Sequence, residues 1–115
     1  MSNSSFVNDW IAIVAVEDLP ELGARVFQTP AGPIAIFRVE SDHIFAVLDR
    51  CPHKGGPLSQ GIVHGKSVTC PLHAWNIQLD NGCAQAPDVG CVKTFTTDIQ
   101  NGLIYFKRSE LQSHA

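Results

Sequence analysis

The stretch that decides the fold consists of two short segments, Cys51-Pro52-His53 and Cys70-Pro71-Leu72-His73. Together they read C-x-H-x16-C-x2-H, so each segment is a clamp that offers one thiolate and one imidazole. The proline after each cysteine has a fixed φ and no N–H, which gives a stiff turn that directs the following ligand. Gly55 and Gly56 follow the first clamp, and glycine lets the backbone approach a bound group closely. The pattern therefore predicts one site built from two loops.

The four ligands predicted from this pattern are Cys51, His53, Cys70 and His73. Two cysteines and two histidines form the ligand set of a Rieske-type [2Fe–2S] cluster. Neutral imidazoles on one iron make the cluster less negative than four thiolates would. The reduction potential then rises from about −400 mV to a range of roughly −150 to +300 mV. The sequence thus predicts an electron carrier whose cofactor and metal ligands are these four residues.

Zinc is the chemical alternative, because two cysteines and two histidines also make an ordinary zinc site. Zinc sites usually pair like ligands, cysteine with cysteine and histidine with histidine, whereas each clamp here is mixed. The clamps also lie in segments rich in proline and glycine, with no helical pattern around either histidine. These features favour the iron–sulfur cluster.

Bulk composition narrows the classes of function. The chain has 115 residues, 44% hydrophobic content and a net charge of −3, and we expect a single domain over residues 1–115. No basic run favours nucleic acid, and no apolar run reaches the roughly 20 residues that span a membrane. The first residues lack the features of a signal peptide, so we expect a cytoplasmic protein. A cytoplasmic location argues against disulfides, and we expect Cys83 and Cys91 to be buried apolar side chains; a regulatory thiol pair is the alternative.

Short strand patterns separated by turns fill most of the chain and predict an all-β fold. We expect a Rieske-type antiparallel β-sandwich or barrel, with a loop-built cluster-binding subdomain at about residues 50–75. Asn101-Gly102 predicts a type I′ hairpin turn. The strands are expected at residues 10–14, 24–28, 34–39, 44–48, 75–79, 92–99 and 103–107.

Longer strings around the clamps resemble a particular family. The first clamp continues to Gly61, the second continues as Ala74-Trp75-Asn76-Ile77, and Gly90-Cys91-Val92-Lys93-Thr94 follows. These strings are similar to the small subunit of assimilatory NAD(P)H-dependent nitrite reductase. The resemblance implies an inner iron held by Cys51 and Cys70 and an outer iron held by His53 and His73. It also implies a large partner subunit with sirohaem, flavin and a [4Fe–4S] cluster, which reduces nitrite to ammonium.

The alternative function is a freestanding Rieske ferredoxin that delivers electrons to an aromatic-ring dioxygenase. A structural subunit whose cluster transfers no electrons is a third possibility. The sequence has no catalytic nucleophile with a base and no phosphate-binding loop, so we expect no catalytic residue and no reaction by this chain alone. We expect apolar residues at the cluster end to dock against the partner, namely Pro57, Leu58 and Leu72.

Overall fold

The computed structural model describes residues 10–40, 43–51, 56–71 and 74–111, and over these residues the protein is all-β, as predicted. Short 3-10 turns lie between strands at Val16–Asp18 (η1) and Leu58–Gln60 (η3), and another, Arg108–Leu111 (η4), follows the last strand. The strands are β1 (Trp10–Ala15), β2 (Gly23–Thr29), β3 (Gly32–Arg38), β4 (Ile44–Leu48), β5 (Ile62–His64), β6 (Ser67–Thr69), β7 (Asn76–Gln78), β8 (Thr94–Phe95), β9 (Thr97–Gln100) and β10 (Leu103–Lys107).

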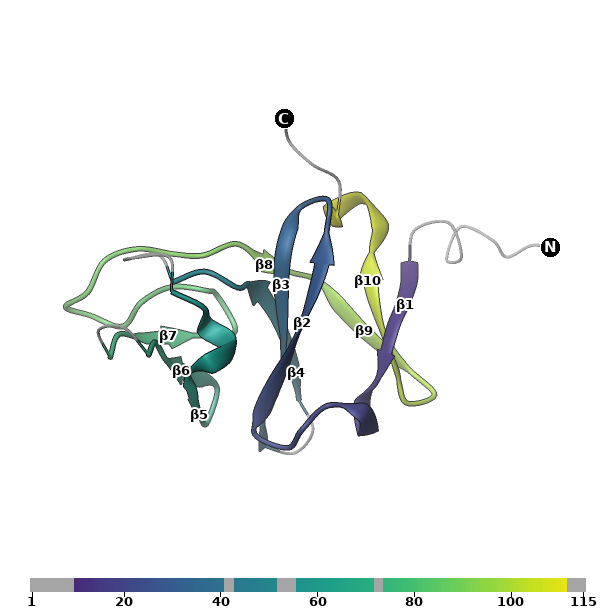
Figure 1. Ribbon diagram of the computed structural model, residues 1–115, viewed down its shortest axis with the longest axis horizontal. Coiled ribbons are helices and arrows are strands. Elements are labelled where there is room, and N and C mark those ends of the chain that lie inside the picture. The colour runs from purple at the N-terminus through teal and green to yellow at the C-terminus, as the bar shows by residue number, and fades with distance from the viewer. Residues whose placement is uncertain (1–9, 41–42, 52–55, 72–73, 112–115) are drawn as a thin grey trace.

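The strands form three antiparallel sheets (Figure 1). A four-stranded sheet, in the order β2-β3-β4-β8, occupies the middle of the molecule. One three-stranded sheet, β1-β10-β9, lies on one side of it, and the other, β5-β6-β7, lies on the opposite side. We call the β5-β6-β7 sheet the clamp sheet, because the chain that joins β6 to β7 contains the second clamp.

Strand β3 is the centre of the packing. The run from Ile34 to Phe37 is fully buried, because successive side chains of a strand point to opposite faces and both faces are covered. Ile34 and Ile36 pack in a hydrophobic cluster with Ile104 of β10. Ala35 and Phe37 pack in a second cluster that contains residues of the clamp sheet. The continuous apolar run thus supplies both cores.

The expected strand over residues 92–99 is divided into β8 and β9. At Thr96, between the two strands, the backbone N–H donates to Glu110 Oε1 at 2.7 Å and the hydroxyl donates to Glu110 Oε2 at 2.8 Å. Strand β8 pairs with β4 in the central sheet, whereas β9 pairs with β10 in the neighbouring sheet. The chain therefore changes sheets at Thr96, and the Glu110 carboxylate takes the place of a strand partner there.

Two hairpin turns, one between β9 and β10 and one between β5 and β6, contain residues with positive φ angles. Asn101 and Gly102 have φ values of 53° and 79°, which confirms the predicted type I′ turn between β9 and β10. Strands β5 and β6 lie where loop structure was expected, and a tight turn at Gly65 joins them. His64 is the last residue of β5.

Candidate iron–sulfur site

The first clamp leaves the central sheet directly after β4. The N–H of Asp49 donates to the carbonyl of Pro33 at 2.8 Å, which fixes the end of the strand. Two residues later, the N–H of Cys51 donates to the carbonyl of Gly56 at 2.7 Å. This backbone bond closes a loop from Cys51 to Gly56.

The second clamp leaves the clamp sheet directly after β6 and has the same closure. The N–H of Cys70 donates to the carbonyl of Trp75 at 2.7 Å, again five residues ahead. Inside this loop the N–H of Ala74 donates to the carbonyl of Cys70 at 3.0 Å, and Ala74 has a φ of 58°. That left-handed conformation turns the chain back into β7. Each predicted cysteine ligand is thus the first residue of a closed loop.

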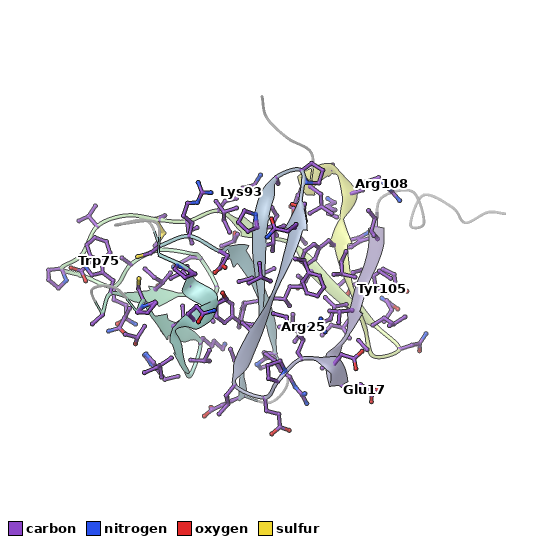
Figure 2. All side chains as sticks on the ribbon, in the orientation of Figure 1. Glu17, Arg25, Trp75, Lys93, Tyr105 and Arg108 are labelled. Carbon is purple, nitrogen blue, oxygen red and sulfur yellow. A yellow bond between two sulfur atoms is a disulfide. The ribbon has the colours of Figure 1, made fainter. Side chains whose placement is uncertain are left out.

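The structure brings the two predicted cysteine ligands into one buried hydrophobic cluster, against which Trp75 (labelled in Figure 2) packs. Cys51 is 3% exposed and Cys70 is 2% exposed, and neither is in a disulfide. Both belong to the hydrophobic cluster that contains Leu58, Val68 and Ile77. Thiolates are costly in such surroundings unless cations neutralise them, and iron supplies that charge. The donor set therefore fits a metal cluster held at this point.

The two predicted histidine ligands, His53 and His73, lie outside the described residues. Each falls in the sequence between the ends of a closed loop, Cys51 to Gly56 and Cys70 to Trp75. His64, the other histidine between the clamps, lies on β5, where its Nε2 is 2.7 Å from Thr69 Oγ1. The hydrogen-bond partner of His64 therefore lies on β6, the neighbouring strand of the clamp sheet.

Asp49 supports the first clamp and was not predicted from the sequence. Its Oδ1 accepts the backbone N–H of Ser59 at 2.7 Å, and its Oδ2 accepts the Ser59 hydroxyl at 2.9 Å. These bonds join Asp49, two residues before the first clamp, to η3, which follows the clamp. A carboxylate and a serine ten residues apart carry no local pattern, so only the folded loop reveals their pairing.

The expectation that Leu58 belongs to a docking surface is wrong. Leu58 is fully buried, because η3 turns its side chain into the core that also holds Cys51 and Cys70. Pro57 is exposed, as that expectation requires, and Leu72 lies outside the described residues. Trp75 is partly buried and packs against the same core.

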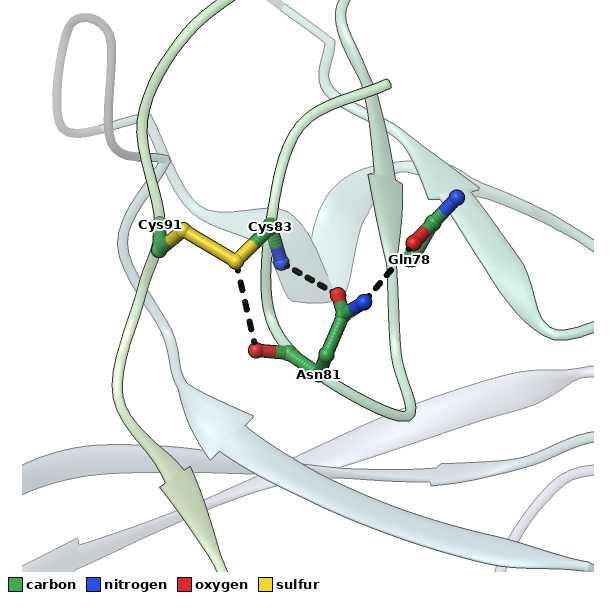
Figure 3. The surroundings of a disulfide bond; sticks show 4 residues. All are labelled: Gln78, Asn81, Cys83 and Cys91. Carbon is green, nitrogen blue, oxygen red and sulfur yellow. Dashed lines mark hydrogen bonds between the residues drawn. A yellow bond between two sulfur atoms is a disulfide. The ribbon is translucent and has the colours of Figure 1, made fainter. Parts of the chain in front are cut away.

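The expectation that Cys83 and Cys91 are buried apolar side chains is also wrong. They form a disulfide, and Cys91 is exposed while Cys83 is partly exposed (Figure 3). The two residues are directly opposite each other in an antiparallel bridge. The N–H of Ala84 donates to Gly90 at 2.8 Å and the N–H of Val92 donates to Gly82 at 2.7 Å. These backbone bonds, which lie beyond the turn after β7, bring the two cysteines together. The sequence carries no indication of this pairing.

Over the described residues, the structure has no helix that is long and apolar enough to cross a membrane.

Comparisons with known proteins agree with this site. Residues 9–96 match the family model described as the Rieske [2Fe-2S] domain. The chain is 38% identical over 103 residues to the 3-phenylpropionate/cinnamic acid dioxygenase ferredoxin subunit of Photorhabdus laumondii, and the match covers 87% of this chain and 95% of that protein. It also matches much larger oxidoreductases, of which it spans less than 20%.

Two solved structures show the same fold. The first is a complex of reduced oxygenase and oxidized ferredoxin in carbazole 1,9a-dioxygenase. One of its chains gives a TM-score of 0.75 at 24% identity, over 85% of this chain and 92% of that chain. The second is a protein named provisionally as a nitrite reductase NADPH small subunit, with a TM-score of 0.75 at 20% identity over 84% of this chain and 96% of that chain. With the family match over residues 9–96, these findings show that the chain belongs to the Rieske [2Fe-2S] domain family and binds one [2Fe–2S] cluster.

Proposed function

We propose that this chain is the ferredoxin component of a multicomponent oxygenase and carries single electrons to a larger oxygenase partner. The observation that carries the proposal is the similarity over nearly the whole length of a dioxygenase ferredoxin subunit. The resemblance to the nitrite reductase small subunit rests on shorter strings, so we now favour the function given above as the alternative. We place the protein in the cytoplasm, where its electron donors and oxygenase partners would be found.

We assign Cys51 and Cys70 to one iron of the cluster and His53 and His73 to the other. The burial of both cysteines in one hydrophobic cluster supports their half of this assignment. When bound, the cluster supplies one-electron chemistry in the potential range typical of this ligand set. The protein contributes two loops whose ends are closed by backbone bonds, and an apolar core that excludes water from the cysteines.

The residues around the clamps would perform distinct tasks in this carrier. Asp49 holds the end of the first loop against η3 through Ser59. Leu58 fills the space behind the loop and keeps that face of the core dry. Pro57 is exposed beside it, and we assign it to the surface that meets the oxygenase.

The small subunit of nitrite reductase is the second candidate. The strings His73-Ala74-Trp75-Asn76 and Gly90-Cys91-Val92 favour it, and its large sirohaem, flavin and [4Fe–4S] subunit would then be the partner. The shared fold with a provisionally named member of that class is compatible with it, but this likeness supports the fold alone.

Affinity purification of the tagged chain from its native cells separates the two candidates. Cells would be grown in parallel on an aromatic acid and on nitrite as sole nitrogen source, and the proteins that co-purify would be identified by mass spectrometry. We expect an oxygenase component and a ferredoxin reductase from the first culture. Recovery of a sirohaem-containing subunit from the second culture, with no oxygenase from the first, would reject the oxygenase proposal.

A further inference from the structure

We propose that Cys83 and Cys91 form a reversible thiol-exchange site, which accepts electrons from a small or protein dithiol and controls how firmly the segment beside the second clamp is held. The inference concerns cysteines outside the predicted ligand set, and it does not depend on which electron partner the chain serves.

Access to the two sulfurs is the first requirement, and the structure meets it. Cys91 is exposed and Cys83 is partly exposed, whereas Cys51 and Cys70 are almost fully buried. Exposed disulfides are the ones that exchange readily with thiols in solution. A dithiol can therefore reach this pair while the folded core protects the predicted ligand cysteines.

Backbone hydrogen bonds that do not involve the sulfur atoms hold the two cysteines opposite each other. The bridge between Cys83 and Cys91 is flanked by hydrogen bonds of their neighbours, from Ala84 to Gly90 and from Val92 to Gly82. In such a pair the two side chains point to the same face and lie close together. Cys83 is further anchored by its N–H, which donates to Asn81 Oδ1 at 2.8 Å (Figure 3). After reduction the two thiols would remain neighbours, so oxidation could restore the bond.

A dithiol would reduce the disulfide in two exchange steps. A thiolate of the dithiol attacks the more exposed Cys91 sulfur, and the electron pair of the broken bond leaves on the Cys83 sulfur, which takes up a proton. The carbonyl of Asn81 lies 3.6 Å from Cys83 Sγ and can accept the new S–H. The second thiol of the reductant then attacks its partner sulfur, releases Cys91 as a thiol and leaves the reductant as a cyclic disulfide. Two electrons and two protons enter the protein.

The disulfide joins two parts of the fold that meet near the second clamp. On one side, the N–H of Gln78 donates to Cys83 and the N–H of Gln85 donates to Asn76, both at 2.9 Å, which adds this segment to the edge of β7. β7 directly follows Trp75, whose carbonyl closes the second clamp. On the other side, Cys91 leads into β8 of the central sheet. Reduction would leave only hydrogen bonds across this junction.

The expected consequence is local opening of residues 82–92 without loss of the cluster. Loop-closure entropy for the nine-residue ring from Cys83 to Cys91 corresponds to an increase in opening of up to roughly 80-fold on reduction. The cytoplasm that we propose for the protein is reducing, and disulfides there are usually transient. The site would thus be open under ordinary conditions and closed under oxidation.

The test uses the iron-loaded protein, equilibrated without oxygen in glutathione buffers from fully oxidised to fully reduced and in dithiothreitol. Samples are quenched in acid, alkylated and cut with a protease that cleaves before aspartate. Cleavage gives residues 80–87 with Cys83, residues 88–97 with Cys91, and residues 49–79 with both predicted ligand cysteines. In the fully oxidised buffer we expect the first two peptides to be cross-linked by the disulfide. In the fully reduced buffer we expect each of them to be alkylated separately. Amide deuterium exchange over residues 82–92 should rise in step.

A double variant, Cys83→Ser with Cys91→Ser, is the matched control, and its exchange should be fast and insensitive to thiol. Failure of the two peptides to cross-link in oxidised glutathione, or to separate in dithiothreitol while the protein stays folded, would overturn the inference. Equal deuterium exchange in both states would overturn the claim about the adjacent segment. Iron content and the visible spectrum, read on the same samples, report the proposed cofactor site independently.

Discussion

Shortening Leu58 to alanine tests whether the first clamp is supported from behind by the core. Leu58 is fully buried in the cluster that contains Cys51 and Cys70. A buried leucine changed to alanine costs about 2–5 kcal/mol, through lost transfer free energy and the cavity left behind. A loss of about 3 kcal/mol, divided by an unfolding entropy of about 0.24 kcal/mol/K for 115 residues, lowers the melting temperature by about 12 °C.

The measurement is an anaerobic melt followed by circular dichroism on iron-loaded wild type and variant at equal concentration. Leu103→Ala is the control, because Leu103 is 39% exposed on β10 and its truncation should cost less than about 1 kcal/mol. Leu58→Glu should destabilise the protein more than Leu58→Ala, since it also buries a carboxyl group without a partner. A Leu58→Ala midpoint within about 3 °C of wild type would refute the reasoning.

Three further predictions concern the cluster, its support and its partner. Cys70→Ser should abolish iron binding, because a hydroxyl is a poor iron ligand, whereas Cys83→Ser should retain the visible and EPR spectra of the wild type. Equal iron loss in both variants would show that the ligands are wrongly assigned. Asp49→Ala should lower the free energy of unfolding by about 1–3 kcal/mol, since it leaves the Ser59 N–H without its acceptor; urea titration measures this, and Asp49→Asn should recover part of the loss. Pro57→Glu should weaken binding of the oxygenase partner by roughly tenfold in a pull-down titration while iron content stays constant, because it adds charge to an exposed site; unchanged affinity would exclude Pro57 from the interface.

The parts of the fold that were predictable from sequence are those with a strong local pattern. The four-residue apolar run of β3 and the Asn101-Gly102 turn each identify a structure without reference to the rest of the chain. Strands β5 and β6 have only three residues each, too few to show alternation. The division at Thr96 depends on Glu110, 14 residues away, so no local window contains it.

Only part of the candidate site was predictable from the sequence. The spacing of the clamps identified the cofactor, because few other ligand sets mix cysteine and histidine in each segment. The burial of Leu58 was not predictable, since it depends on a 3-10 turn between proline and glycine. The disulfide was not predicted, because two cysteines eight residues apart carry no local pattern that fixes their pairing. The partner was not predictable from the strings around the clamps, because they are short and hold no contact with another protein.

The double burial of β3 has a consequence for how this protein can be divided and inherited. Ala35 and Phe37 contribute to the core beneath the clamps, and Ile34 and Ile36 contribute to the core beneath β10. Neither half therefore keeps a complete interior when the other is removed. A peptide that contains the two clamps alone would lack the Ala35 and Phe37 side chains that fill its core. The domain should accordingly unfold in one cooperative step, and we expect it to be inherited as one unit that includes β10.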